Sequence, residues 1–280
     1  MSNSVLVSIP ARLAGDVDCE NLVVRSRSCD EITSAYKTLG DRVNGVELEN
    51  LGEDLSSLTA LPLGLPVRVK LHPGDAPHLY TNTWLGDRFS LEVLMDVDKG
   101  LLQGAKIATS NMVPVTVNLE EVSDTGELMS ALDYYLHDTH VQVPVEFFHS
   151  MITACLRGET VSLLDLYPES PVEFLHVDES GRVSASARLA RAGRFLGTIS
   201  GGLKIDEESQ LYEDLLHRKK TLVLSGSKCI SCEGFDLCEG YLRFVDTNFD
   251  CDPFLEVFSA IKVTAKEIAD DLAKAEELGE

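Results

Sequence analysis

The chain has 280 residues, 44% of them hydrophobic, and a formal net charge of -22 at pH 7. This length is enough for a sizeable core with a smaller unit appended to it. The acidity argues against binding to nucleic-acid phosphates or anionic membrane surfaces, and it suits a cytoplasmic protein or a partner with a basic face. No apolar run approaches the roughly 18 residues of a membrane span, and Met1–Leu13 lacks the features of a secretory signal.

The first half of the chain alternates between strand and helix patterns. Asp30 and Gly40 are expected to begin and end the first helix. Strands that alternate with helices predict a parallel sheet or barrel built from right-handed crossovers. A weak strand is expected at residues 4–10 and a loop at 75–88. Helical segments are expected at 31–39, 55–61, 100–109 and 125–137, and the six main strands at 22–28, 45–51, 66–72, 89–97, 113–119 and 141–148.

A linker at Pro168–Pro171 follows a possible short strand at 161–166. It predicts a division into a first domain, residues 1–165, and a second, residues 166–280. The second domain is expected to contain a hairpin at 172–187, a helix at 207–218 capped by Asp206, and a helix at 253–278 with Pro253 in its first turn. Four arginines are interpreted as a solvated hairpin edge, with contact to an acidic partner as the alternative: Arg182, Arg188, Arg191 and Arg194.

Four of the seven cysteines lie between residues 229 and 251. The other three, Cys19, Cys29 and Cys155, are scattered, so the pattern favours a reducing compartment over disulfides. A C-x2-C step brings two thiolates to one side of a turn, and Gly234 eases the bend toward the third. An iron–sulfur cluster is the favoured interpretation, with structural zinc and free thiols as alternatives. The candidate metal ligands are Cys229, Cys232, Cys238 and Cys251.

The spacing C-x2-C-x5-C followed by Gly-Tyr resembles the cluster-binding C-terminal extension of radical SAM peptide-modifying enzymes, the SPASM or twitch domain. Val177–Val183 is similar to the β-hairpin of that extension, and Leu196–Ile199 to the Leu-Gly-Asn-Ile that follows it. The resemblance covers about residues 172–262. It implies an α/β fold with an open six-unit β/α partial barrel, then a small cysteine-rich α+β domain and a C-terminal helix. The six predicted strands favour such a barrel independently.

The chain departs from this family at several positions. A radical SAM enzyme carries C-x3-C-x2-C after its first barrel strand, and three thiolates there hold the [4Fe–4S] cluster that cleaves S-adenosylmethionine. Here Arg25–Cys29 offers one thiol, and Gly52–Leu55 only partly resembles the Gly-Gly-Glu-Pro segment that contacts S-adenosylmethionine. Ser184, Ser186 and Leu242 stand where further cluster thiols would be expected. The resemblance therefore implies one auxiliary [4Fe–4S] cluster, held by the four clustered cysteines, and no binding of S-adenosylmethionine.

These features predict a catalytically degenerate, cytoplasmic partner subunit of an active radical SAM enzyme that modifies ribosomal peptides or proteins. The subunit would form a heterodimer and bind the substrate peptide, complete the active site or relay an electron; its catalytic residues, if any, remain unidentified. One alternative is a zinc-stapled binding or scaffold module. Another is a hydrolase or isomerase that uses His72, Glu146 and His149 at the carboxyl ends of the strands. Other polar residues expected there are Arg25, Arg27, Glu49, Asp96, Asn118 and Glu120.

Overall fold

A computed structural model describes residues 5–51 and 55–278. Within these residues the strands form one eleven-stranded sheet. In chain order they are β1 (Leu6–Pro10), β2 (Leu22–Ser26), β3 (Val43–Leu48), β4 (Pro66–Leu71), β5 (Ser90–Val97), β6 (Val115–Val122), β7 (Val145–Glu146), β8 (Phe174–Val177), β9 (Arg182–Ser184), β10 (Gly197–Thr198) and β11 (Lys204–Ile205). The spatial order is β11-β10-β9-β8-β1-β2-β3-β4-β5-β6-β7.

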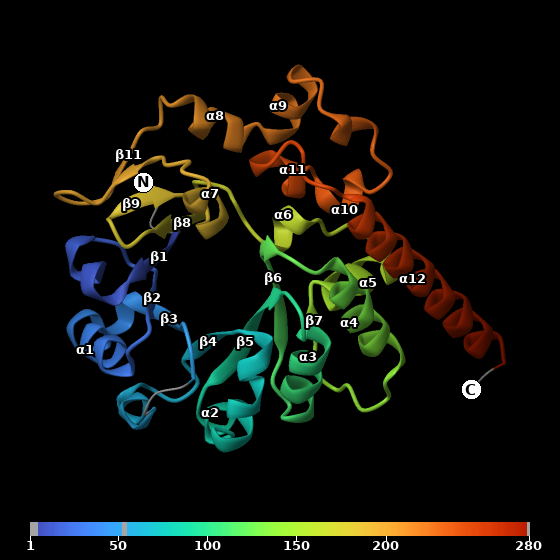
Figure 1. Cartoon of the computed structure of the whole chain (residues 1–280), viewed down its shortest axis with the longest axis horizontal. Helices are drawn as coiled ribbons and strands as arrows, with labels where there is room; N and C mark the ends of the chain where they lie inside the picture. The colour runs from blue at the N-terminus through green and yellow to red at the C-terminus, as the bar shows by residue number, and fades with distance from the viewer. Residues whose placement is uncertain (1–4, 52–54, 279–280) are drawn as a thin grey trace.

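Neighbouring strands are parallel from β8 through β1 to β7, and antiparallel from β8 to β11. The parallel part curves around the centre of the molecule (Figure 1). The α-helices of the described chain are α1 (Cys29–Leu39), α2 (Trp84–Arg88), α3 (Leu101–Ser110), α4 (Thr125–His137), α5 (Phe148–Leu156), α6 (Leu163–Leu166), α7 (Ala187–Arg191), α8 (Gln210–Leu216), α9 (Arg218–Leu224), α10 (Phe235–Cys238), α11 (Tyr241–Val245) and α12 (Asp252–Leu278). Its 3-10 helices are η1 (Ala11–Asp16), η2 (Gly40–Arg42), η3 (Ser56–Ala60), η4 (Pro73–Thr81) and η5 (Lys228–Ser231).

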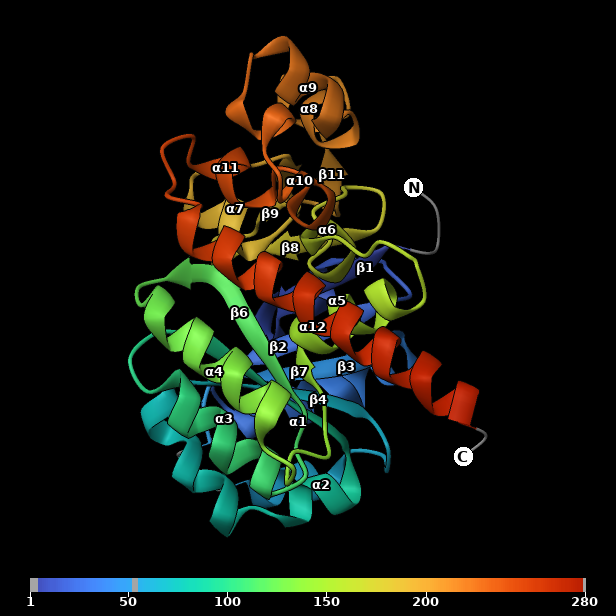
Figure 2. The ribbon, with the colours of Figure 1, turned by 90° about the vertical axis from the view of Figure 1, so that its right-hand side faces the viewer.

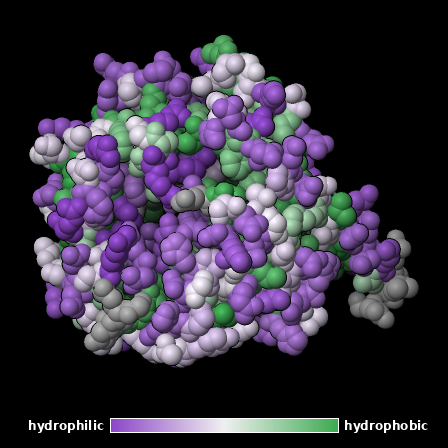
Figure 3. Space-filling model, in the orientation of Figure 1, coloured by the Kyte–Doolittle hydropathy of each residue, from purple (hydrophilic) through white to green (hydrophobic). Residues whose placement is uncertain are grey.

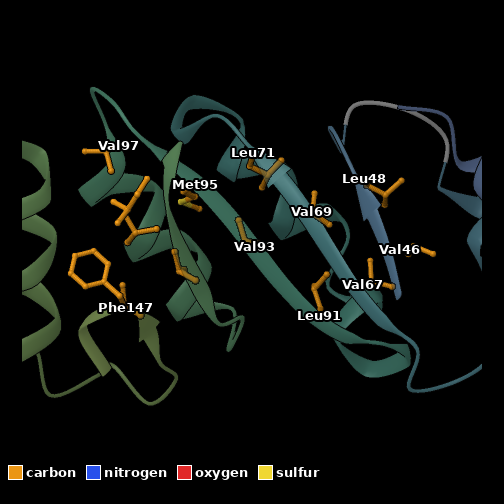
Figure 4. Packing of buried hydrophobic residues seen from close by; sticks show 14 of the residues in the cluster. Val46, Leu48, Val67, Val69, Leu71, Leu91, Val93, Met95, Val97 and Phe147 are labelled. Carbon is orange, nitrogen blue, oxygen red and sulfur yellow. The ribbon is translucent and has the colours of Figure 1, made fainter. Parts of the chain in front are cut away.

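Alternation along the parallel strands separates an apolar outer face from a polar inner face. In β4 the buried side chains of Val67, Val69 and Leu71 alternate with Arg68 and Lys70. Figure 4 shows apolar side chains of this kind carried by β3, β4 and β5. Burying each one contributes roughly 1.5–3 kcal/mol, which anchors α1, α3 and α4 on the outer face of the sheet. The long α12 packs across α4 and α5 (Figure 2).

Five of the six main predicted strands are confirmed as β2 to β6, and the sixth is reduced to β7; these strands pair in parallel in chain order. The weak strand predicted at 4–10 is β1 from residue 6 on, since residues 1–4 lie outside the described part. The predicted helices at 31–39, 100–109, 125–137 and 253–278 are confirmed as α1, α3, α4 and α12, and the helical patch at 55–61 is η3. The hairpin is formed by β8 and β9.

Several local predictions were wrong. The capping residues are Ser28 for α1 and Ser209 for the 207–218 region, rather than Asp30 and Asp206. Residues 161–166 contain α6 instead of a strand, because Ser162 and Asp165 form a capping box. Residues 75–88 contain most of η4 and all of α2 instead of a loop, residues 141–148 contribute only the two paired residues of β7, and the helix at 207–218 is divided between α8 and α9.

The sheet crosses the predicted domain boundary, because β8 pairs with β1 and places His176 beside Ser8. One sheet thus contains strands from both sides of that boundary. The division into residues 1–165 and 166–280 stays a prediction. In the described part of the chain, no helix combines the length and the apolar character that a membrane span requires.

Candidate functional site

The inner face of the curved sheet borders a cavity of about 960 Å³. Side chains from the parallel strands line it, together with side chains from α7 and α11. Figure 3 shows that this face of the molecule is hollowed near its centre and rimmed mostly by hydrophilic side chains. Closed β/α barrels instead fill this space with branched apolar side chains, so a polar and open interior indicates a binding site.

A row of four charged side chains of alternating sign crosses the cavity wall. Arg25, Glu47, Arg68 and Glu92 lie side by side in register on β2, β3, β4 and β5. Arg68 donates two hydrogen bonds to Glu92, of 2.9 and 3.0 Å. Burial raises the pKa of Glu47, and the neighbouring charges of Arg25 and Arg68 oppose this shift. The row therefore contains one close ion pair, Arg68 with Glu92, while Arg25 and Glu47 oppose each other in charge on neighbouring strands.

A second polar layer lies nearer the carboxyl ends of the strands. Lys70 is 3.7 Å from Asp96 and 3.6 Å from Glu120. Asn118 donates a hydrogen bond of 2.5 Å to Asp96, and Arg191 of α7 pairs with Glu120. This layer therefore links α7 to β6 across the top of the cavity.

His176 of β8 lines the cavity and is only 8% exposed. Burial, reinforced by the charge of Arg25, lowers its pKa from 6.5 to about 3, against the opposing influence of Asp178. The imidazole is therefore neutral at pH 7 and can accept a hydrogen bond at one ring nitrogen.

Glu169, between α6 and β8, joins three helices through a buried ionic network. Its side chain is 1% exposed and accepts hydrogen bonds from Arg188 of α7, at 2.8 and 3.1 Å, and from Arg218 of α9, at 2.7 Å. Burial would raise the pKa of Glu169, but the two guanidinium groups lower it. Arg188 also lies 3.9 Å from the ring centre of Tyr241, and Arg218 lies 3.9 Å from that of Phe244. The network therefore connects the cavity wall to α11.

The interpretation of the arginine run as a solvated edge was wrong for Arg188, which is 8% exposed. The other three also have intramolecular partners: Arg182 pairs with Asp178, Arg191 with Glu120, and Arg194 donates to the carbonyl of Phe244. The helix α7 interrupts the hairpin edge and turns this segment toward the cavity.

The three residues of the hydrolase alternative are not assembled into one set. His72 and Glu146 line the cavity, and His72 lies 3.6 Å from Asp96. His149 is not one of the residues that line the described cavity, and its Nδ1 shares a hydrogen bond of 2.7 Å with the hydroxyl of Tyr135. This arrangement does not form the proposed acid–base or metal-binding set.

The four clustered cysteines lie around α10. Cys229 belongs to η5, Cys238 ends α10 and Cys251 immediately precedes α12. Burial raises the pKa of Cys238 to about 11, and the charges of Cys251 and Cys229 add to this shift. Burial also raises the pKa of Cys251, and the charges of Cys229 and Cys232 add to that shift. The fold thus groups four thiols whose sulfur chemistry suits iron or zinc. Among the described residues, no three His, Cys, Asp or Glu side chains are arranged to hold a metal ion, so ligation stays a prediction.

A left-handed turn places two backbone donors beside Cys238. Glu239 and Gly240 have φ values of 49° and 75°, and the backbone N–H groups of Gly240 and Leu242 lower the pKa of the Cys238 thiol. Amide groups in this position stabilise a thiolate, and hydrogen bonds to cluster sulfurs help to set the reduction potential of iron–sulfur centres. A Cβ at Gly240 would collide with the side chain of Leu222 on α9. This turn explains the glycine after the third cysteine.

Replacing Gly240 with Ala is expected to destabilise the protein by about 2 kcal/mol, since alanine strains the left-handed backbone and meets Leu222. Gly226, with φ of 63° and open space around it, is the matched control. Gly226→Ala should cost about 1 kcal/mol through the backbone alone. Urea unfolding of both variants measures the difference, and equal losses would contradict the steric part of the argument.

The positions that depart from the family are used structurally. Cys29 is 3% exposed and packs in the core, and Leu242 is 4% exposed. Ser186 caps α7 and donates a hydrogen bond of 2.8 Å to Glu169, while Ser184 donates one to the carbonyl of Arg194. Most of the partial match to the Gly-Gly-Glu-Pro segment, residues 52–54, lies outside the described residues.

Several cavity residues lie away from the strand ends, either within the strands or, for Glu169, in the segment between α6 and β8. The polar positions within the strands carried the signal, since a strand buried on both faces would be apolar throughout. The residues missed are Glu47, Arg68, Lys70, Glu92, Glu169 and His176.

The chain thus combines a mostly parallel α/β sheet, helices on the outer face of that sheet and a cavity on its inner face. Among solved structures, the chain is similar to native anSMEcpe with bound AdoMet. The TM-score is 0.59, at 12% sequence identity over 94% of this chain and 88% of that one. At this identity the likeness shows the fold alone. Neither a protein-family model nor a curated protein sequence matches the chain.

Proposed function

We propose that this chain is a catalytically degenerate radical SAM-like protein, the partner subunit of an active radical SAM enzyme in ribosomal-peptide or protein modification. The observation that carries the proposal is a combination: the cavity is open and polar, and the segment that follows β2 offers a single thiol. Cys29, that thiol, is buried in the core and cannot by itself hold a radical-generating cluster. A substrate-binding role accounts for retaining the cavity without that cluster.

The proposal includes the six β/α units of β2 to β7 as the partial barrel and the region after residue 165 as a reduced SPASM-like domain. Cys229, Cys232, Cys238 and Cys251 would hold one [4Fe–4S] cluster, which supplies one-electron transfer when bound. The N–H groups of Gly240 and Leu242 would stabilise the Cys238 thiolate. A zinc-stapled scaffold remains the alternative for these thiols, because tetrahedral sulfur ligation suits zinc as well.

The test begins with the neighbouring genes, where the proposal expects an intact C-x3-C-x2-C protein and a small peptide, and continues with reconstitution of these with this chain. We expect a stable complex, and modification of the peptide only when both proteins are present. Alone, the reduced chain should not cleave S-adenosylmethionine. Cleavage by the isolated chain, or full peptide modification without it, would contradict the proposed role.

A further inference from the structure

Most charged side chains that line the cavity pair with one another. Within the described residues, five cations of the lining have a carboxylate in ion-pair contact on a neighbouring element or loop, and Lys70 bridges two. The pairs are Arg27 with Glu49, Arg68 with Glu92, Arg182 with Asp178, Arg188 with Glu169, Arg191 with Glu120, and Lys70 with Asp96 and Glu120. Two lining carboxylates, Glu47 and Glu146, are left without such a contact in this part of the chain.

These two carboxylates have different surroundings. Glu47 lies in register between Arg25 and Arg68, whose charges favour its ionised form. Glu146, on the edge strand β7, has a buried Oε2 atom with no hydrogen-bond partner in the described structure. Tyr135 and Tyr167 lie near Glu146, and their pKa values are raised mainly by burial and further by the charge of Glu146.

A buried carboxylate oxygen without a donor is costly, and a cation from a ligand removes that cost through a charge-assisted hydrogen bond. Tyr167 lines the same cavity, and an aromatic ring adds to the attraction for a cation. The cavity volume of about 960 Å³ is at the upper end for small-ligand sites and admits a short peptide segment.

Arg25 of β2 lines the same cavity and lies on the same face of the sheet as Glu47 and Arg68. Its Nε is buried without an acceptor, although its Nη2 donates to the carbonyl of Val177. The cavity lining therefore includes one buried donor, Arg25 Nε, and one buried acceptor, Glu146 Oε2, without a hydrogen-bond partner in the described residues.

We infer that Glu146 is the acceptor for a lysine ammonium or arginine guanidinium group of a peptide bound in the cavity. The inference rests on the proposed substrate-binding role and names the side-chain class that this role selects. Glu146 acts here as a specificity-determining residue.

Three capped tripeptides test the inference by calorimetric titration of the full-length protein: acetyl-Gly-Lys-Gly-amide, its norleucine analogue and its glutamate analogue. We expect the lysine peptide to bind at least about 10-fold more tightly than either analogue, the factor that one charge-assisted hydrogen bond commonly gives. Glu146→Gln and Glu146→Ala should both abolish the preference. Asp133→Asn, at an exposed carboxylate outside the cavity lining, is the control and should retain it.

Thermal unfolding of Glu146→Gln shows whether the variant is folded, and its melting temperature should not fall, because the isosteric amide removes a buried charge. Equal affinity for the three peptides, a lysine preference that survives both Glu146 substitutions, or no binding of the lysine peptide at millimolar concentration overturns the inference. These outcomes are separate from complex formation with the radical SAM partner, which tests the proposed function.

Discussion

Replacing Glu169 with Gln is expected to lower the free energy of unfolding by about 3–5 kcal/mol. The carboxylate is 1% exposed and is shared by Arg188 and Arg218, which are 8% and 5% exposed. Glutamine has nearly the same shape but no charge, so both guanidinium groups would stay buried without a counter-ion. Arg218 already has one buried nitrogen, Nη1, without a partner in the described structure. The loss should loosen the contacts of α7, α9 and α11 around the cavity.

Denaturant unfolding measures this effect, and Glu49→Gln is the matched control. Glu49 also pairs with an arginine, at 2.7 Å, but the side chain of Arg27 is 79% exposed. A solvent-exposed pair of this kind contributes roughly 0–1 kcal/mol. A Glu169→Gln variant that loses less than its control would show that the buried network does not hold these helices.

Acidification from pH 7 to pH 5 is expected to remove about 2 kcal/mol of stability through His176 alone. Its pKa falls from 6.5 to about 3 on folding, so the unfolded chain binds a proton that the folded chain excludes. Stability from this residue is present above pH 6.5 and is lost as the pH falls toward about 3. Burial is the main cause, and the charges of Arg25, Arg191 and Lys70 add to it.

His176→Gln should flatten the pH dependence of unfolding between pH 7 and pH 5. His140, whose side chain is 93% exposed, provides the control, and His140→Gln should leave the dependence unchanged. Unfolding curves of the three proteins at each pH measure the difference. If His176→Gln retained the full dependence, the imidazole would not be excluded from protonation in the folded state.

The sequence predicted much of the sheet because alternation within the strands reflects burial directly. Residues 66–72 read as a strand, and β4 follows that prediction closely, with Val67, Val69 and Leu71 in the core. The divided helix at 207–218 and the loop at 75–88 were mispredicted because α9 has no side-chain cap and η4 contains Pro77. Short segments of this kind take their conformation from tertiary contacts more than from local propensity.

The site was only partly accessible from the sequence. His72 and Glu146 were identified as strand-end residues that face the cavity, yet their distance from His149 depends on how β7 runs into α5. The contact between Glu169 and Arg218 joins residues far apart in the chain, and no local pattern marks it. The spacing of the cysteines indicated a shared site, but spacing alone does not orient their sulfur atoms.

We expect Cys229, Cys232, Cys238 and Cys251 to hold an iron–sulfur cluster in a chain that does not generate radicals. Quantification of iron, acid-labile sulfide and zinc in anaerobically purified protein, with its visible absorption spectrum, tests it most directly. We expect iron and sulfide at the stoichiometry of one [4Fe–4S] cluster, lost in Cys238→Ser and retained in Cys155→Ser. Stoichiometric zinc with no visible absorption, or no bound metal in the intact protein, would contradict it.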